Sequence, residues 1–385
     1  MSIVHADTVR APATAGAPSL VAISRAGLWA LVVAHVVAGW GTQWDIQWHL
    51  RIGRDSFWIA PHVMTYSGVT LMVLVSFGVL AWTSWRARHG ERDAGGLRVL
   101  GIRSTRGWHL AAWSILLTVL AAPIDDLWHR LFGLDVTLWS PPHLLGLVGG
   151  VLNAGACWAI AQEVYPPGSR ARRVALVVAG ALVAGGLSVA LQPGIRMAYV
   201  YGGVRFFTYP ILGALLLPLA LAVVARVTGR RAAPLLALLA MLAFGFAGSA
   251  VARAGFAWLQ PVSFIAEEIA KDPTSPIAIS HEISRKNGNV PGAANLRALL
   301  VALLATLVLI AVDPRRRPVA ASIAFGLTLG AGFGLALARQ PAFAASLPSA
   351  GATVAALGVT VLAAAAGGAL AARLADALRT EEAAS

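Results

Sequence analysis

The sequence LVVAHVVAGWGTQWDIQWHLRIGRDSFWIAPHVMTYSGVTLMVLV, residues 31–75, joins two apolar runs through a short polar segment. That segment, DIQWHLRIGRDSFWIAPH at residues 45–62, contains aspartates, arginines and histidines in a chain that is only 12% charged. An apolar run of about 18 or more residues is long enough to cross a bilayer as a helix. The stretch therefore predicts two membrane helices that meet at one membrane face and carry ionisable groups there.

Apolar runs separated by short polar connections continue along all 385 residues. The chain is 58% hydrophobic with a mean hydropathy of +0.72, whereas soluble domains are about one-quarter charged. We therefore expect an all-α fold, a polytopic bundle of transmembrane helices with about ten spans. The expected spans are residues 26–49, 61–85, 107–129, 142–164, 174–192, 209–227, 234–252, 293–312, 318–338 and 350–374.

The net charge of +13 comes almost entirely from arginines in the connections between apolar runs. Such clustering is typical of topology signals, since basic connections stay in the cytoplasm, so we expect no nucleic-acid partner. The rule places both termini in the cytoplasm, residues 1–24 as a cytoplasmic tail, in a bacterial-type cytoplasmic (inner) membrane. Residues 253–292 then form a long connection at the outer face, which we interpret as a lid or a partner surface.

A second copy of the polar segment, DDLWHRLFGLDVTLWSPPH, occupies residues 125–143. Both copies follow the pattern D-x-x-W-H-x-x-x-G-x-D, then W, then P-H, which indicates an internal duplication of a helix–loop–helix unit. The expected topology places both copies at the outer (periplasmic or extracellular) face. We therefore expect residues 25–165 to form a four-helix membrane unit with both copies, and residues 166–385 to add further transmembrane helices.

The spacing within each copy predicts a metal site. An aspartate and a histidine four residues apart share one face of a helix, and the second histidine follows a proline that suits the first turn of the next helix. Two imidazoles and one carboxylate suit a first-row transition metal, and they suit copper and zinc equally well, so the spacing alone does not separate the two metals. A competing interpretation is a polar ring that only holds the helix hairpins together. The predicted ligands are Asp45, His49 and His62 in the first copy, and Asp125, His129 and His143 in the second.

Other polar and aromatic side chains receive simpler interpretations. His35 falls in the middle of a span, where a hydrogen-bonded buried histidine is favoured over a proton relay. His281 falls in the long connection and is expected to face solvent. The single cysteine, Cys157, excludes an internal disulfide framework. The tryptophans near the two copies are expected to form an interfacial belt: Trp44, Trp48, Trp58, Trp128 and Trp139.

The segment at residues 45–62 resembles the metal-binding segment of the C subunit of the particulate methane and ammonia monooxygenase family, the copper membrane monooxygenases. The resemblance covers about residues 25–165. It implies copper ligands at Asp45, His49 and His62, and a second, catalytic copper site at Asp125, His129 and His143. The chain departs from the family at Asp125, where the family has asparagine, and in lacking the family's acidic pair after the second motif's first histidine.

The resemblance implies a copper-dependent membrane monooxygenase, or its metal-bearing subunit, that activates dioxygen to hydroxylate a small apolar substrate. The substrate would arrive from the lipid bilayer, and further monooxygenase subunits or a homo-oligomer are expected as partners. The alternative is a copper-binding membrane transporter or metal-delivery protein without oxygenase activity. A transporter should carry ligands through the membrane midplane, where only His35 lies, so a fixed site near one face is favoured.

Overall fold

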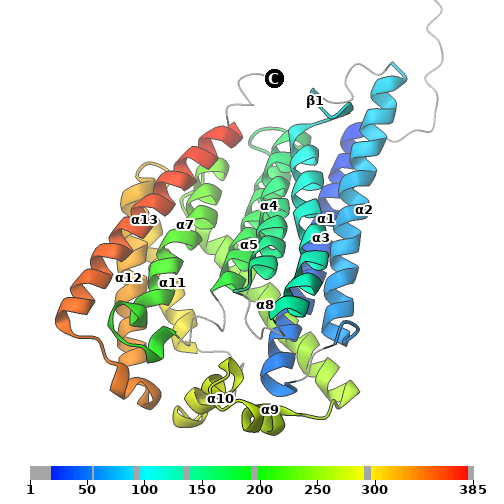
Figure 1. The fold of residues 1–385 in the computed structure, drawn as a ribbon. Helices are drawn as coiled ribbons and strands as arrows, with labels where there is room; N and C mark the ends of the chain where they lie inside the picture. The colour runs from blue at the N-terminus through cyan, green and yellow to red at the C-terminus, as the bar shows by residue number, and fades with distance from the viewer. Residues whose placement is uncertain are drawn as a thin grey trace, which may run out of the picture.

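The computed structural model describes residues 19–53, 56–90, 96–132, 139–191, 198–289 and 296–379. The chain folds as an all-α bundle whose long helices run side by side (Figure 1). Within these described ranges, nine helices are long and apolar enough to cross a membrane. The protein is therefore a multi-pass membrane protein, as predicted.

The long helices are α1 (Leu20–Arg51), α2 (Ala60–Arg88), α3 (Arg106–Phe132), α4 (Pro141–Val164), α5 (Arg170–Ala190), α7 (Thr208–Thr228), α8 (Ala233–Leu259), α11 (Leu296–Val312), α12 (Pro318–Ala338) and α13 (Ala350–Arg379). The short elements are α9 (Ile265–Lys271), α10 (Pro276–Lys286), the 3-10 helices η1 (Gly203–Phe207) and η2 (Pro341–Ser346), and an antiparallel hairpin of β1 (Leu97–Val99) and β2 (Ile102–Ser104).

Several predicted spans differ from the observed helices at their ends. The helix α1 begins at Leu20, inside the tail expected at residues 1–24, of which residues 1–18 lie outside the described part of the chain. The helix α11 covers only 17 residues of the span expected at 293–312, and residues 290–295 before it lie outside the described part of the chain. The helix α8 continues to Leu259, seven residues beyond the predicted end at residue 252. Arg253 does not stop this helix, because the apolar sequence AGFAWL follows it and packs against α1.

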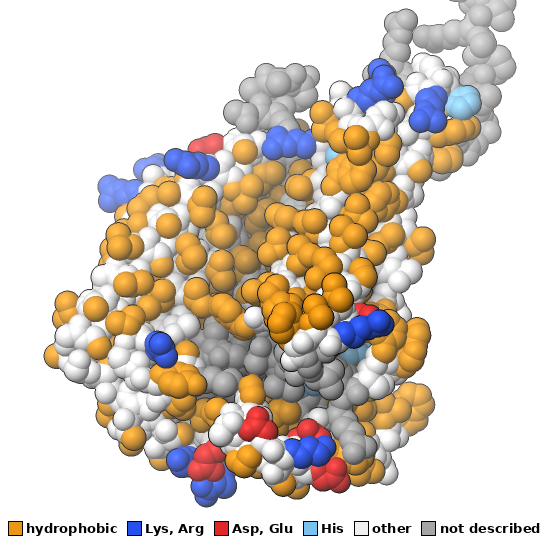
Figure 2. All heavy atoms as spheres, in the orientation of Figure 1, with side chains coloured by type: hydrophobic (Ala, Val, Ile, Leu, Met, Phe, Trp, Pro, Cys, Tyr) orange, Lys and Arg blue, Asp and Glu red, His pale blue; other side chains and the backbone are white. Residues whose placement is uncertain are grey.

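The two ends of the bundle differ in charge. Since successive long helices alternate in direction, both copies of the polar motif fall at the end that also carries α9 and α10 (Figure 1). We call this the motif end, and the opposite end, where the described chain finishes, the arginine-rich end. Figure 2 shows basic side chains gathered along the arginine-rich end and a mixture of acidic and basic ones at the motif end. The arginines of the arginine-rich end are Arg25, Arg86, Arg88, Arg98, Arg103, Arg106, Arg170, Arg172, Arg173, Arg226, Arg230, Arg231, Arg315, Arg316, Arg317, Arg373 and Arg379.

The duplication seen in the sequence extends to the packing of the helices. A Cβ added to Gly68 on α2 would lie 2.6 Å from the backbone nitrogen of Ala38 on α1. A Cβ added to Gly149 on α4 would lie 2.7 Å from the backbone nitrogen of Thr118 on α3. These four positions match in the two copies, so each hairpin brings its helix backbones together at the same point.

A second crossing of the paired helices lies one turn before each aspartate. The glycine at this crossing is on the first helix of one hairpin and on the second helix of the other. A Cβ on Gly41 of α1 would lie 2.5 Å from the backbone nitrogen of Thr65 on α2. In the second copy the first helix has Ala121 and the second helix has the glycine, Gly146, whose added Cβ would lie 3.4 Å from the Ala121 Cβ. Gly41 therefore allows a close backbone approach in the first hairpin, whereas a Cβ on Gly146 would make only an ordinary van der Waals contact in the second.

The four-helix unit shares its core with the rest of the chain. The Trp40 indole on α1 donates a 2.9 Å hydrogen bond to the Phe244 carbonyl on α8, and the Trp158 indole on α4 donates a 3.0 Å bond to the Leu176 carbonyl on α5. Small residues also join the later helices, since a Cβ on Gly367 of α13 would lie 2.3 Å from the Leu215 carbonyl oxygen on α7. The apolar core is continuous from α1 to α13.

Neighbouring glycines on α4 allow a direct test of the hairpin contact. We expect Gly149→Ala to lower the free energy of unfolding by about 1–3 kcal/mol, because the new methyl group has no room against α3. The control is Gly150→Ala, whose added Cβ has no neighbour within 4 Å. Thermal unfolding in detergent should show a lower Tm for Gly149→Ala alone, and equal values would contradict the close contact.

Candidate metal centre

The first polar motif brings its three predicted ligands together between the last turns of α1 and the first turn of α2. Asp45 and His49 are one turn apart on α1, and their Oδ1 and Nε2 atoms are 3.6 Å apart. Pro61 begins α2 in the position where proline fits a helix. It places His62 so that its Nε2 lies 3.1 Å from the same Oδ1 atom of Asp45.

The geometry of these three side chains fits a metal ion. One donor atom from each residue lies within 4.8 Å of the others. Two ligands about 2.1 Å from a tetrahedral ion are separated by roughly 3.4 Å, close to the two oxygen–nitrogen distances here. Asp45 Oδ1 is buried and forms no hydrogen bond with any described residue, although the His62 nitrogen is near. An ion between the donor atoms would satisfy this oxygen, so the donor set fits a transition metal.

The three ligands are partly shielded from solvent. Their side chains are 20% exposed for Asp45, 23% for His49 and 18% for His62. The two imidazole rings have centroids 6.5 Å apart at an angle of 53°, and the Tyr66 ring lies 5.7 Å from the His62 ring. The site is therefore half-buried beside aromatic side chains, with an open side.

The tryptophans near the motif do not all form the predicted interfacial belt. Trp58 and Trp139 are exposed, but Trp44 and Trp48 are buried. Trp48 stacks on Phe256 of α8 with centroids 5.8 Å apart, and Trp44 meets the edge of the same ring. The belt prediction is wrong for these two, because α8 extends far enough to cover this face of α1.

The second motif repeats part of this arrangement. Asp125 Oδ1 on α3 lies 3.4 Å from His143 Nε2 at the start of α4, and both side chains are half-buried. The backbone of His129 follows Asp125 by one helical turn, while its side chain lies outside the described part of the structure. Arg54, Asp55 and Asp135 also fall outside the described residues. The adjacent Asp126 instead pairs with Arg130 at 2.7 Å on an exposed face.

The long connection at the motif end caps α1. The last carbonyl groups of a helix lack partners within the helix, and here the connection supplies them. The Ser263 hydroxyl donates to the Arg51 carbonyl at 2.7 Å, the Phe264 amide to the Ile52 carbonyl at 2.7 Å, and His281 Nε2 to the Leu50 carbonyl at 2.8 Å. The connection therefore supports the helical turn that carries His49, while its expected role as a lid or a partner surface stays a prediction.

Two of these capping side chains were not assigned a role from the sequence. His281 was expected to face solvent, but it is half-buried and bonded to α1. Ser263 carried no motif at all. The length of the connection is the one signal that pointed to this region, and length does not identify which donors reach which carbonyl groups.

Two acidic side chains of the connection, Asp272 and Glu282, accept hydrogen bonds from other residues of the same connection. Arg285 donates two hydrogen bonds to Glu282, at 2.8 and 2.7 Å, which lowers the pKa of that carboxyl to about 2. The hydroxyl of Thr274 donates to Asp272 at 2.7 Å and lowers the pKa of that carboxyl as well. Both groups stay ionised at neutral pH and help to fix the turns around α10.

The histidine in the middle of α1 is half-buried and forms a hydrogen bond between helices. His35 Nε2 lies 2.9 Å from the side-chain oxygen of Asn153 on α4. The Asn153 amide in turn donates a 2.7 Å hydrogen bond to the Ala111 carbonyl on α3. The predicted hydrogen bonding of His35 is confirmed, although its side chain is only half-buried, and the contact links three helices of the four-helix unit.

Comparisons of the chain with protein-family models, with curated proteins and with solved structures found no match.

The hydrogen bonds that cap α1 can be tested through metal binding at Asp45, His49 and His62. We expect the double variant Ser263→Ala/His281→Ala to weaken metal binding about tenfold, because each lost hydrogen bond leaves a carbonyl without its donor at a cost of about 1 kcal/mol and frees the last turn of α1. His281→Gln, whose amide can still donate, should restore part of the affinity. Metal titration in detergent provides the measurement.

The matched control is Ser280→Ala, a serine of the same helix whose hydroxyl makes no hydrogen bond to α1. It should bind metal like the wild type. An unchanged affinity in the double variant would show that the connection does not position His49.

Proposed function

We propose that the protein is a copper-dependent membrane monooxygenase, or the metal-bearing subunit of one, with copper bound by Asp45, His49 and His62. The observation that carries the proposal is the convergence of these three side chains from two helices, with donor atoms within 4.8 Å of one another. Ionisable groups at the edge of a bilayer are costly and favour a functional role. The resemblance of residues 45–62 to copper membrane monooxygenases supports the metal and the reaction class.

The residues of the site supply binding and shielding. Asp45 provides a carboxylate oxygen, and His49 and His62 provide neutral imidazole nitrogens, a donor set that suits copper. Bound copper would supply one-electron redox chemistry toward dioxygen, and three protein ligands leave a coordination position open. The half-buried setting restricts access of water to this open side.

The second motif is proposed as a second copper site, with Asp125, His129 and His143 as its ligands. The 3.4 Å contact between Asp125 and His143 supports a shared site for these two side chains. Asp125 adds a negative charge where related proteins are expected to have a neutral asparagine. A carboxylate stabilises the higher charge state of a metal more strongly than an amide does, so the second site would differ in redox behaviour from that of the resembled family.

The side chains around the first site suit a route by which an apolar substrate reaches the site from the bilayer. Phe57, Trp58 and Val63 flank His62 and expose large apolar surfaces. Exposed apolar side chains of this size suit contact with lipid rather than water. We propose that a small apolar substrate reaches the site along this flank and that its hydroxylation draws two electrons from an external reductant.

The charge difference between the two ends supports an orientation. Arginines remain on the cytoplasmic side of bacterial membrane proteins, so the arginine-rich end is proposed to face the cytoplasm. Both metal motifs would then face the periplasmic or extracellular side of the inner membrane.

Copper content provides the first test. We expect purified wild type to bind copper in preference to zinc, and Asp45→Ala and His62→Ala to lose the first site with at least a tenfold drop in affinity, because each removes one of three ligands. Asp126→Ala is the matched control, since this exposed carboxylate pairs with Arg130. Metal analysis and EPR of the membranes give the readout. Unaltered copper in both Asp45→Ala and Asp125→Ala would show that the ligands are wrong.

Product formation separates the oxygenase from the alternative function. With ascorbate and a redox mediator as the reductant, the copper-loaded protein should insert one atom of ¹⁸O₂ into a lipophilic substrate and reduce the other to water. Asp45→Ala should form no labelled product. Normal copper binding with no labelled product, together with transfer of copper to an apo acceptor, would instead establish a copper-delivery protein or transporter.

A further inference from the structure

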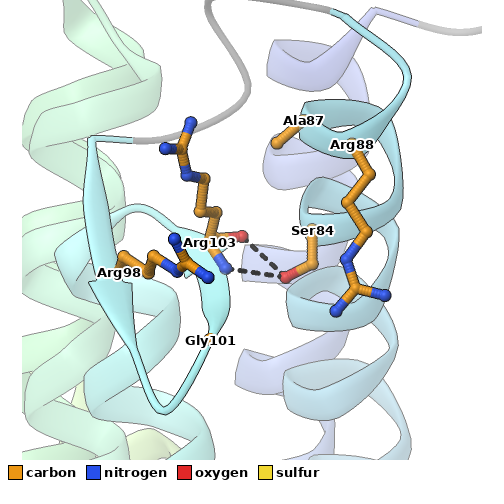
Figure 3. A pocket seen from close by; sticks show the side chains of 6 residues that line it. All are labelled: Ser84, Ala87, Arg88, Arg98, Gly101 and Arg103. Carbon is orange, nitrogen blue, oxygen red and sulfur yellow. Dashed lines mark hydrogen bonds between the residues drawn. The ribbon is translucent and has the colours of Figure 1, made fainter.

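A β-hairpin at the arginine-rich end is fixed against the last turns of α2 (Figure 3). The buried Ser84 hydroxyl accepts a 2.9 Å hydrogen bond from the Arg103 amide and donates a 2.8 Å bond to the Arg103 carbonyl. The neighbouring Thr83 hydroxyl donates to Ser104 at 2.9 Å. These side chains of α2 supply hydrogen bonds to β2 that a further strand would supply in a larger sheet. The hairpin is therefore held in a fixed position against α2.

The hairpin and α2 enclose a basic cavity of about 300 Å³, lined by Ser84, Ala87, Arg88, Arg98, Gly101 and Arg103. Figure 3 shows Arg98 and Arg103 on the hairpin side of this cavity and Arg88 on the α2 side. Among the described residues, no carboxylate forms an ion pair with any of the three guanidinium groups. Residues 91–95, which include Glu91 and Asp93, lie outside the described part of the chain. Guanidinium groups bind phosphate oxygens through paired hydrogen bonds, so this cavity suits a phosphate group.

An apolar cavity of about 260 Å³ adjoins the basic one and shares Ser84 and Arg88 with it. Its other lining residues are Phe77, Leu80, Ala81, Trp85 and Ile102. Trp85 is 53% exposed at this point of α2, the position of an interfacial tryptophan. Figure 2 shows hydrophobic side chains covering the surface of the bundle below the hairpin. The phosphate-sized basic cavity thus continues into a surface that suits an acyl chain.

The tip of the hairpin indicates where the bilayer begins. Leu100 and Gly101 form a two-residue turn with positive φ values of 50° and 81°, which suits a tight hairpin. Leu100 is 83% exposed, and the tip points along α2 toward the middle of the bundle (Figure 3). Transfer of an exposed leucine from water to hydrocarbon is favourable. The hairpin tip therefore suits contact with acyl chains, which would place the arginines near the lipid headgroups.

We propose that these adjoining cavities bind an anionic phospholipid, with its phosphate among Arg88, Arg98 and Arg103 and an acyl chain along Trp85 and Ile102. Charge complementarity selects an anionic lipid, since basic pockets beside transmembrane helices recognise such headgroups. The apolar cavity distinguishes the lipid from a free phosphate ion. The site is at the opposite end of the bundle from the metal motifs and is independent of the metal chemistry.

The affinity for lipid tests the basic part of the site. Delipidated protein in detergent is titrated with phosphatidylglycerol and, separately, with phosphatidylcholine, and bound lipid is measured by native mass spectrometry. The wild type should prefer phosphatidylglycerol. Arg98→Gln/Arg103→Gln should weaken phosphatidylglycerol binding roughly thirtyfold, because each arginine near a headgroup contributes about 1 kcal/mol.

The matched control is Arg170→Gln/Arg317→Gln, which removes the same charge from two exposed arginines at the same end. It should bind phosphatidylglycerol within about twofold of the wild type. Equal losses in the two double variants would overturn the proposal, because the attraction would then come from the overall charge of this end. The circular dichroism spectrum and the copper content of each variant show that the fold is intact.

A third variant separates a lipid from free phosphate. Ala81→Trp fills the apolar cavity and leaves the arginines in place, so it should weaken phosphatidylglycerol binding about tenfold and leave the affinity for inorganic phosphate unchanged. Displacement of bound lipid by millimolar inorganic phosphate, with no effect of Ala81→Trp, would show an anion site and overturn the lipid proposal. Lack of preference between the two lipids would overturn it as well.

Discussion

Backbone contact between paired helices is the constraint on which the candidate metal centre depends. Asp45 and His62 come from different helices, and their side chains are short, so they reach 3.1 Å only if α1 and α2 approach closely. Gly41 and Gly68 provide that approach because any side chain at either position would meet the facing backbone. The second hairpin obtains a similar approach at Gly149. Packing through small residues drives helix association in membranes, where lipid offers no hydrophobic gain.

The polar groups of the protein are distributed according to the solvent at each depth. In the hydrocarbon layer, His35 and Asn153 satisfy each other, since water is not present to do so. At the motif end the carbonyls of α1 obtain donors from a distant connection. At the arginine-rich end, Arg231 donates to the final carbonyl groups of α11. The arginines of this end thus cap helices as well as giving it its positive charge.

Much of the fold could be predicted because it depends on local properties of the sequence. The length of an apolar run determines whether it spans a membrane, and the spacing of Asp45, His49 and His62 determines that they share one end of a hairpin. The predicted convergence of this first set is therefore confirmed. The convergence of His129 with the second pair, and the identity of any metal, stay predictions.

The features that could not be predicted depend on contacts between distant parts of the chain. Trp44 and Trp48 are buried because Phe256 lies against them, some two hundred residues later. His281 faces α1 for the same kind of reason. The hairpin at residues 97–104 was also missed, because its arginines read as topology signals and its anchoring by Ser84 has no local sequence signature.

The cap on α1 has a consequence for the order in which the protein is made. Chains fold from the N-terminus as they are synthesised, so the hairpin of α1 and α2 enters the membrane before Ser263 and His281 exist. The final turn of α1 acquires its carbonyl partners only after α8 has crossed the bilayer and the connection has folded back. The candidate metal centre is therefore completed late, and a nascent or truncated chain that ends before residue 260 carries Asp45, His49 and His62 without the support that holds His49.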